Sequence, residues 1–253
     1  MTSTDVNGHE RESDGQSDGE APGRRPAGTL LAPLYARCAL LAAAIALVAL
    51  AGHFFDLPLL ARFLPGRPAL SPMTALAVMV AASALILLRS APSSASWLAA
   101  VQIILGSAIV AARAAGIPER EWIPSAWWSS PLTGVGLALS GAGTALLVSG
   151  RVVIGQVLAF AMALMSILFG LAHVFPAADL YRYLPGTGVA IPTVLSLLAL
   201  SFGQLLSFSE RGASAALSPR NPAGRAGLRL LAVGALAALS VAASCDALAL
   251  GSR

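Results

Sequence analysis

Two histidines are the side chains of this chain with the clearest capacity for chemistry. His53 and His173 lie 120 residues apart, and each precedes a similar motif, RFLPG from Arg62 and RYLPG from Arg182. Two imidazoles at matched depth are ligands that haem or a transition metal accepts. The alternative is a pair of interfacial histidines hydrogen-bonded to loop backbone, and the lack of an obvious third ligand favours it. We therefore predict no metal and no cofactor, and keep both histidines as candidate ligand-binding residues.

Three charged residues hold matching places in the motif and its copies, namely Arg62, Glu121 and Arg182. One interpretation is an ion-pair ring that closes three loops. A second is coordination of an anionic ligand at the membrane surface. A third is simple anchoring, because arginine and aromatic residues commonly lie at the membrane edge. These three residues join the two histidines as candidate ligand-binding residues.

The motif belongs to a unit that occurs three times. A weaker copy, EWIPS from Glu121, lies between the first and the last, and Pro72, Pro131 and Pro192 each open an apolar run after a copy. The interval between copies is about 60 residues, which is the range of tandem structural repeats. In the middle copy, Ala112 takes the place of the histidine. Because each unit holds two apolar spans, the copies share one orientation, and we predict a pseudo-threefold axis near the membrane normal, unlike inverted repeats.

Composition places these units in a membrane. The chain is 57% hydrophobic and 11% charged, against about 25% charged for a soluble domain. Several apolar runs approach the roughly 20 residues that cross a bilayer as a helix. The prediction is an all-α polytopic transmembrane bundle of seven spans, three helix-hairpin repeats (about 36–89, 97–150 and 152–208) and an extra helix at 228–250. The spans are Ala36–Phe55, Pro72–Leu88, Trp97–Ala115, Pro131–Ser149, Val152–Phe175, Pro192–Phe208 and Leu228–Leu250.

Residues 1–28 have almost no apolar content, so we expect a disordered cytoplasmic tail at 1–33 before a transmembrane domain at 34–253. We expect the protein to lie in the inner (plasma) membrane of the cell. Arginines are more frequent on one side of the predicted spans, and this places the N-terminus in the cytoplasm. The long motif loops and the C-terminus then lie outside. We expect each motif loop to form either a short helix in the membrane interface or a lid over the bundle.

Several functions are disfavoured by what the sequence lacks. There is no lysine to form a retinal Schiff base, and the scattered arginines give no nucleic-acid patch. No His-Glu-x-x-His or Gly-x-Ser-x-Gly motif is present, so we predict no enzyme. Glycines near the fourth span suit close helix packing. Gln102, Gln156 and Gln204 are expected to face the bundle interior, and Cys38 and Cys245 to be small buried hydrophobes.

One run also resembles a known family. LSPMTALAV from Leu70, continuing to Arg89, is similar to an element of an uncharacterised bacterial multi-pass membrane module found N-terminal to PAS, histidine kinase or diguanylate cyclase domains. The stretch from Glu210 to Gly227 is similar to the inner loop of that module. The resemblance implies sensory input, here without an output domain, through a partner membrane protein or a separate signalling output protein. The alternatives are a structural or assembly subunit of a membrane complex, or a small-solute permease.

Overall fold

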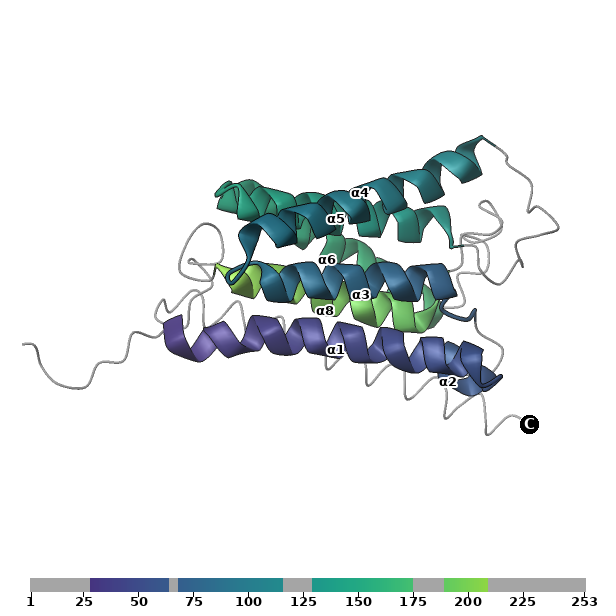
Figure 1. Cartoon of the computed structure of the whole chain (residues 1–253). Coiled ribbons are helices and arrows are strands. Elements are labelled where there is room, and N and C mark those ends of the chain that lie inside the picture. Colours follow the sequence, from purple (N-terminus) through teal and green to yellow (C-terminus); the bar gives the residue numbers. More distant parts are fainter. Residues whose placement is uncertain (1–27, 64–67, 116–128, 175–188, 209–253) are drawn as a thin grey trace, which may run out of the picture.

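The computed structural model describes residues 28–63, 68–115, 129–174 and 189–208, with side chains from Leu34 onward. Within these ranges the chain is entirely helical (Figure 1). Its helices are α1 (Gly28–Phe54), α2 (Pro58–Arg62), α3 (Pro72–Leu87), α4 (Pro92–Ala114), α5 (Pro131–Val148), α6 (Val152–Val174) and α8 (Ile191–Ser207). The all-α class is therefore confirmed for the described residues.

Six predicted spans coincide with six of these helices, and two of the predicted starts need correction. The first helix begins at Gly28 rather than Ala36, so the end of the predicted disordered tail is helical. Helix α4, the third predicted span, begins at Pro92 rather than Trp97. A proline suits the first helical turn, because its missing N–H has no partner to lose there. The predicted helix at 228–250 lies outside the described residues.

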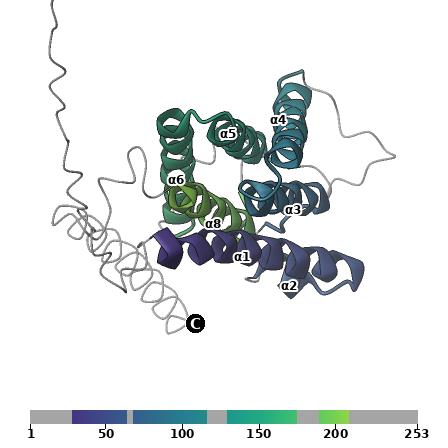
Figure 2. The ribbon, with the colours of Figure 1, turned by 60° about the vertical axis from the view of Figure 1, so that its left-hand side comes forward.

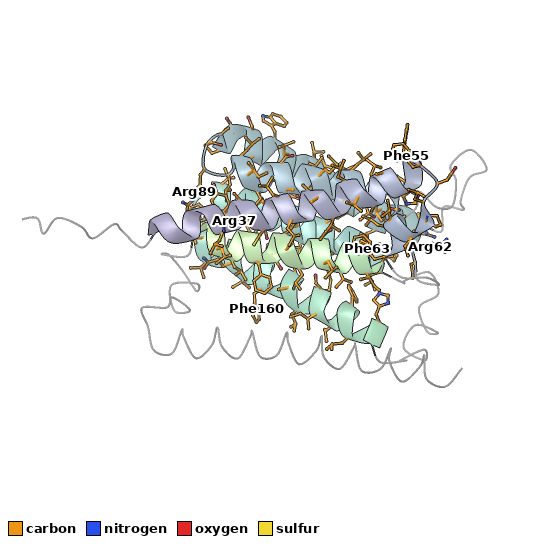
Figure 3. All side chains as sticks on the ribbon, turned by 90° about the horizontal axis from the view of Figure 1, so that it is seen from below. Arg37, Phe55, Arg62, Phe63, Arg89 and Phe160 are labelled. Atoms are coloured by element: carbon orange, nitrogen blue, oxygen red, sulfur yellow. The ribbon has the colours of Figure 1, made fainter. Side chains whose placement is uncertain are left out.

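Four helices are long and apolar enough to cross a membrane, namely those within α1, α4, α5 and α6. Large apolar side chains cover the outside of the bundle, such as Trp97, which is 75% exposed, and Phe160, which is 58% exposed. In Figure 3, Phe160 points away from the other helices. Because such a surface is unfavourable in water and favourable in lipid, the chain is an integral membrane protein.

The described helices form an inner and an outer set (Figure 2). The inner helices α3, α5 and α8 contact one another. Each outer helix lies in the groove between two of them, with α1 against α3 and α8, α4 against α3 and α5, and α6 against α5 and α8. The inner helices α3 and α8 have 16 and 17 residues, which is about 25 Å at 1.5 Å per residue. The shortest apolar helices are thus the ones that protein surrounds.

The three inner helices are buried in the same register. All nine buried residues of α5 have a buried counterpart 59 positions earlier, in or just after α3, and another 60 positions later in α8. Five of them, at 133, 137, 140, 144 and 147, follow the 4–3 spacing of a helix-packing seam. Ser140 and Thr144 of this seam both contact Gln204 of α8. The seam therefore faces the other inner helices.

The starts of α3 and α5 share one design and are tied together. Ser71 and Ser130 cap the two helices, and each serine Oγ accepts a hydrogen bond of 3.2 Å from the backbone N–H of the threonine three residues on. The Ser129 hydroxyl bonds that of Ser71 at 2.8 Å and also that of Thr74. These hydroxyl contacts fix the starts of two inner helices side by side at one end of the bundle.

Candidate functional site at the histidine end of the bundle

His53 and His173 lie at one end of the bundle, which we call the histidine end, and make the same contact in two different hairpins. The Nε2 of His53, near the end of α1, is 2.6 Å from the carbonyl oxygen of Leu70. The Nε2 of His173, near the end of α6, is 2.6 Å from that of Val189. A carbonyl oxygen only accepts, so Nε2 is the donor in both bonds. Each imidazole thereby fastens the end of an outer helix to the residue before the cap of an inner helix.

This geometry agrees with the interpretation of the two histidines as hydrogen-bonded to backbone. The proton on each Nε2 occupies the nitrogen that most often binds a metal. Among the residues that the structure describes, no three His, Cys, Asp or Glu side chains gather closely enough to hold a metal ion. The two histidines are best explained as staples between helices.

The burial pattern identifies a third residue at the same position. Ala39, Ala99 and Ala159 follow one another at intervals of 60 residues in the outer helices, and all three are fully buried. The same interval leads from His53 to Arg113 and on to His173. The sequence analysis placed Ala112 opposite the histidines, and this assignment is wrong by one residue. Two apolar runs can be aligned one residue out of register without a visible mismatch, whereas the buried face of each helix determines the register.

Of the three charged candidates, the described residues include only Arg62. Arg62 ends α2, the short helix that turns back beside the end of α1, and its side chain is exposed. The Leu57 N–H donates to the Gly52 carbonyl at 2.8 Å, and the Leu70 N–H donates to the Ala61 carbonyl at 2.9 Å. The exposed apolar side chains of this turn suit a helix in the membrane interface. Glu121 and Arg182 lie outside the described residues, as do two of the three motif loops.

The predicted interior glutamines are buried, and they differ in their contacts. Gln204 donates its Nε2 to the Ser140 carbonyl at 2.7 Å and to the Thr144 hydroxyl at 2.9 Å. Gln156 donates to the Phe208 carbonyl at 3.3 Å. Gln102 is fully buried in α4, and neither of its amide atoms has a hydrogen-bond partner in the described structure. Gln204 thus joins two inner helices, and Gln156 joins the outer helix α6 to the end of α8. The Gln102 amide and the Gln204 Oε1 are buried without a hydrogen bond in the described structure.

A cluster that the sequence analysis missed lies at the opposite end, which we call the Arg89 end. The guanidinium of Arg89 donates from Nη2 to the carbonyl of Ser207. It also lies over the rings of Tyr35, at 5.3 Å, and Phe208, at 5.7 Å. The sequence analysis counted Arg89 only as a determinant of orientation. No local pattern could reveal the cluster, because its members come from three segments more than 50 residues apart.

The described part of the chain carries little acidic charge. Asp56 is the one carboxylate among the residues that the structure describes, against five arginines at positions 37, 62, 89, 113 and 151. Arg37 and Arg89 lie at one end of the bundle and Arg62 at the other (Figure 3). The chemistry available here is thus hydrogen bonding by arginine, histidine, serine, threonine and glutamine.

Comparison of the chain with known protein families, with curated proteins and with solved structures finds no match in any of the three. The geometry described above therefore carries the functional argument.

Replacing His53 or His173 by alanine is expected to lower the free energy of unfolding by about 1 kcal/mol each, the usual net value of one hydrogen bond. The two losses should add, because the staples hold different pairs of helices. Melting temperatures of the purified variants, measured with and without added Zn²⁺ or chelator, test this. His9→Ala, in the N-terminal tail, is the control. A large stabilisation by the metal that both substitutions abolish would instead indicate a metal site.

Proposed function

We propose that this protein is a non-enzymatic membrane module of the sensory-input type, composed of three tandem helical hairpins and a seventh helix at 228–250. The observation that carries the proposal is the shared burial register of α3, α5 and α8. Three copies of one hairpin, each with an inner and an outer helix, would produce this register and the alternating contacts of inner and outer helices. The resemblance of the Leu70–Arg89 run to an element of bacterial input modules supports the sensory role.

The packing of the inner helices suits a module that changes conformation. Of the nine recurring positions, α3 has alanine at five and α5 has glycine at four. Small residues let helix backbones approach closely without interlocking large side chains. Switching membrane proteins commonly use small shifts of packed helices against each other. In this proposal, an event at the histidine end changes the packing, and a partner protein reads the change at the Arg89 end.

The orientation of the module follows from its arginines. Arg37 and Arg89 lie at the end where the N-terminal tail enters α1, and Arg151 lies between α5 and α6 at that end. Positively charged residues favour the cytoplasmic side of an inner membrane. The Arg89 end is then cytoplasmic, and the histidine end, with Arg62, faces outward to receive a ligand. The proposed partners are a membrane protein or a separate signalling output protein.

The test is purification of the tagged protein from its native membrane into lipid nanodiscs, with quantitation of whatever accompanies it. The proposal expects a signalling protein to bind and a small ligand to raise the melting temperature, less so in Arg62→Ala than in Arg37→Ala. A protein that runs alone and responds to no ligand contradicts it. Association with one complex at fixed stoichiometry, without response to ligand, would favour a structural subunit instead. Solute uptake by proteoliposomes that Arg62→Ala abolishes would favour a permease.

A further inference from the structure

At the Arg89 end, two of the three neighbouring pairs of inner and outer helices are connected by a short loop, and the third pair is not. The chain passes from α3 to α4 through residues 88–91, and from α5 to α6 through residues 149–151. The third equivalent pair is α8 with α1, which pack against each other along the bundle. No short connection joins them there, because α1 is the first of these helices and α8 the last. Among the described residues, this α1–α8 seam is therefore held by non-covalent contacts.

Arg89 lies at this seam and contacts both of its helices. Ser207 is the last residue of α8, and the last carbonyls of a helix have no partner within the helix itself. The Arg89 guanidinium supplies a donor, and a cation is favoured at the negative end of the helix dipole. On its faces lie the ring of Tyr35, from α1, and that of Phe208, the C-cap of α8. One side chain of α3 thus holds the end of α8 beside α1.

Near the Arg89 end of the seam, α1 and α8 are in close contact at a small residue. A Cβ atom on Gly203 would lie 3.3 Å from the Cβ of Cys38 and 3.3 Å from the Tyr35 carbonyl oxygen. The surfaces meet here without a large side chain from α8 inserting into α1. Interfaces of this kind can separate and re-form at little cost in side-chain rearrangement.

We propose that the α1–α8 seam is the joint at which the bundle opens, and that Arg89 is its latch. The other two junctions cannot part by more than their loops of a few residues allow. Arg89 is exposed, so an anion or a partner's carboxylate can compete for its guanidinium. A regulatory role for the opening of this seam rests on the proposed sensory function, whereas the latch itself is a property of the isolated protein.

Cys38 serves as a reporter of the seam. Its thiol is half-buried and lies against Gly203, and replacing Cys245 by serine leaves Cys38 as the single thiol of the chain. In nanodiscs, Arg89→Ala is expected to raise the rate of Cys38 labelling by a small maleimide about tenfold. Arg37→Ala, which removes the same charge two residues after Tyr35, is expected to leave the rate within twofold. Equal rates in the two variants would overturn the proposal.

A disulfide across the seam provides the second measurement. In Gly203→Cys, the new Cβ lies close to the Cys38 Cβ, and the nearest obstacle is the flexible Cδ2 end of Leu85 at 2.5 Å. With copper–phenanthroline as oxidant, the bridge should form several-fold more slowly once Arg89 is alanine. If Arg89→Ala does not fold, Phe208→Leu removes one ring and should give a smaller increase in labelling. Unchanged labelling in Phe208→Leu would then overturn the latch.

These measurements use purified protein with no stimulus and no partner, so they separate the two proposals. Latch behaviour in a protein that binds no partner and responds to no ligand would leave the seam proposal standing and remove the sensory function. A ligand response that persists unchanged in the disulfide-locked protein would keep the sensory function and overturn the seam as its joint.

Discussion

Replacing Gly106 by alanine is expected to destabilise the bundle more than any other single-methyl change in the described helices. A Cβ at Gly106 would lie 2.5 Å from the Gly134 carbonyl oxygen and 2.6 Å from the Ala138 backbone nitrogen. The approach is mutual, because a Cβ at Gly134 would lie 2.8 Å from the Gly106 carbonyl oxygen. Both obstacles are backbone atoms of packed helices, so the added methyl can be accommodated only if α4 moves away from α5.

The expected loss of unfolding free energy for Gly106→Ala is about 1–3 kcal/mol, the range for overpacking of a filled core. Gly170→Ala in α6 is the matched control, because its new Cβ would meet only Val194 Cγ1, at 3.5 Å. There the gain in helix propensity, up to about 1 kcal/mol, should leave stability unchanged or raised. Thermal unfolding in detergent or nanodiscs compares the two. Equal melting temperatures would show that α4 and α5 are not packed backbone to backbone.

The second large effect is expected for Gln204→Glu. The Gln204 amide is buried against the face of α5 that packs on the other inner helices. It donates to the carbonyl and hydroxyl of Ser140 and to the hydroxyl of Thr144. A carboxylate at this site cannot donate to the carbonyl and carries a charge into the protein interior, one turn from the end of α8. Insertion scales place the cost of a charge at a helix centre at about 2.5–3.5 kcal/mol, and because Gln204 lies near a helix end we expect a smaller loss, of about 2 kcal/mol, at neutral pH.

Gln204→Leu separates the charge from the hydrogen bonds. Leucine has a similar length and removes all three bonds, and the Ser140 and Thr144 hydroxyls are left to bond backbone within their own helix. Its cost should be about 1 kcal/mol, in line with interhelical hydrogen bonds measured in membrane proteins. Ser83→Ala, on an exposed surface of α3, should change little. If the glutamate and leucine variants were equally stable, Gln204 would not lie in a dry interior.

Some of the fold could be predicted because its causes are local. Pro72, Pro131 and Pro192 each lie in a first helical turn, and the caps Ser71 and Ser130 stand directly before two of them. The length and apolarity of the runs that follow were enough to locate six helices to within a few residues at most of their ends. The starts of α1 and α4 were the exceptions, and in α1 the residues Pro33 and Arg37 interrupt the apolar run that begins after Gly28.

The candidate site was predictable only in part. The sequence identified His53 and His173 as a matched pair, and the structure supplied their partners, the carbonyls of Leu70 and Val189. A backbone carbonyl has no residue type, so no motif points to it. Arg113 was missed for a related reason, because its equivalence to the histidines rests on which face of α4 is buried. Glu121, Arg182 and the helix at 228–250 remain predictions.

The sequence by itself determined that this chain enters a membrane as helices, because burial in lipid depends on the apolarity of consecutive residues. It also indicated where α3, α5 and α8 begin, because prolines that recur about every 60 residues lie in their first turns. Only the tertiary structure decided which helices lie inside, which glycines touch backbone and which helix end Arg89 holds. The bond from Arg89 to Ser207 spans 118 residues, and contacts at such separations follow from the packing of whole helices rather than from any local pattern.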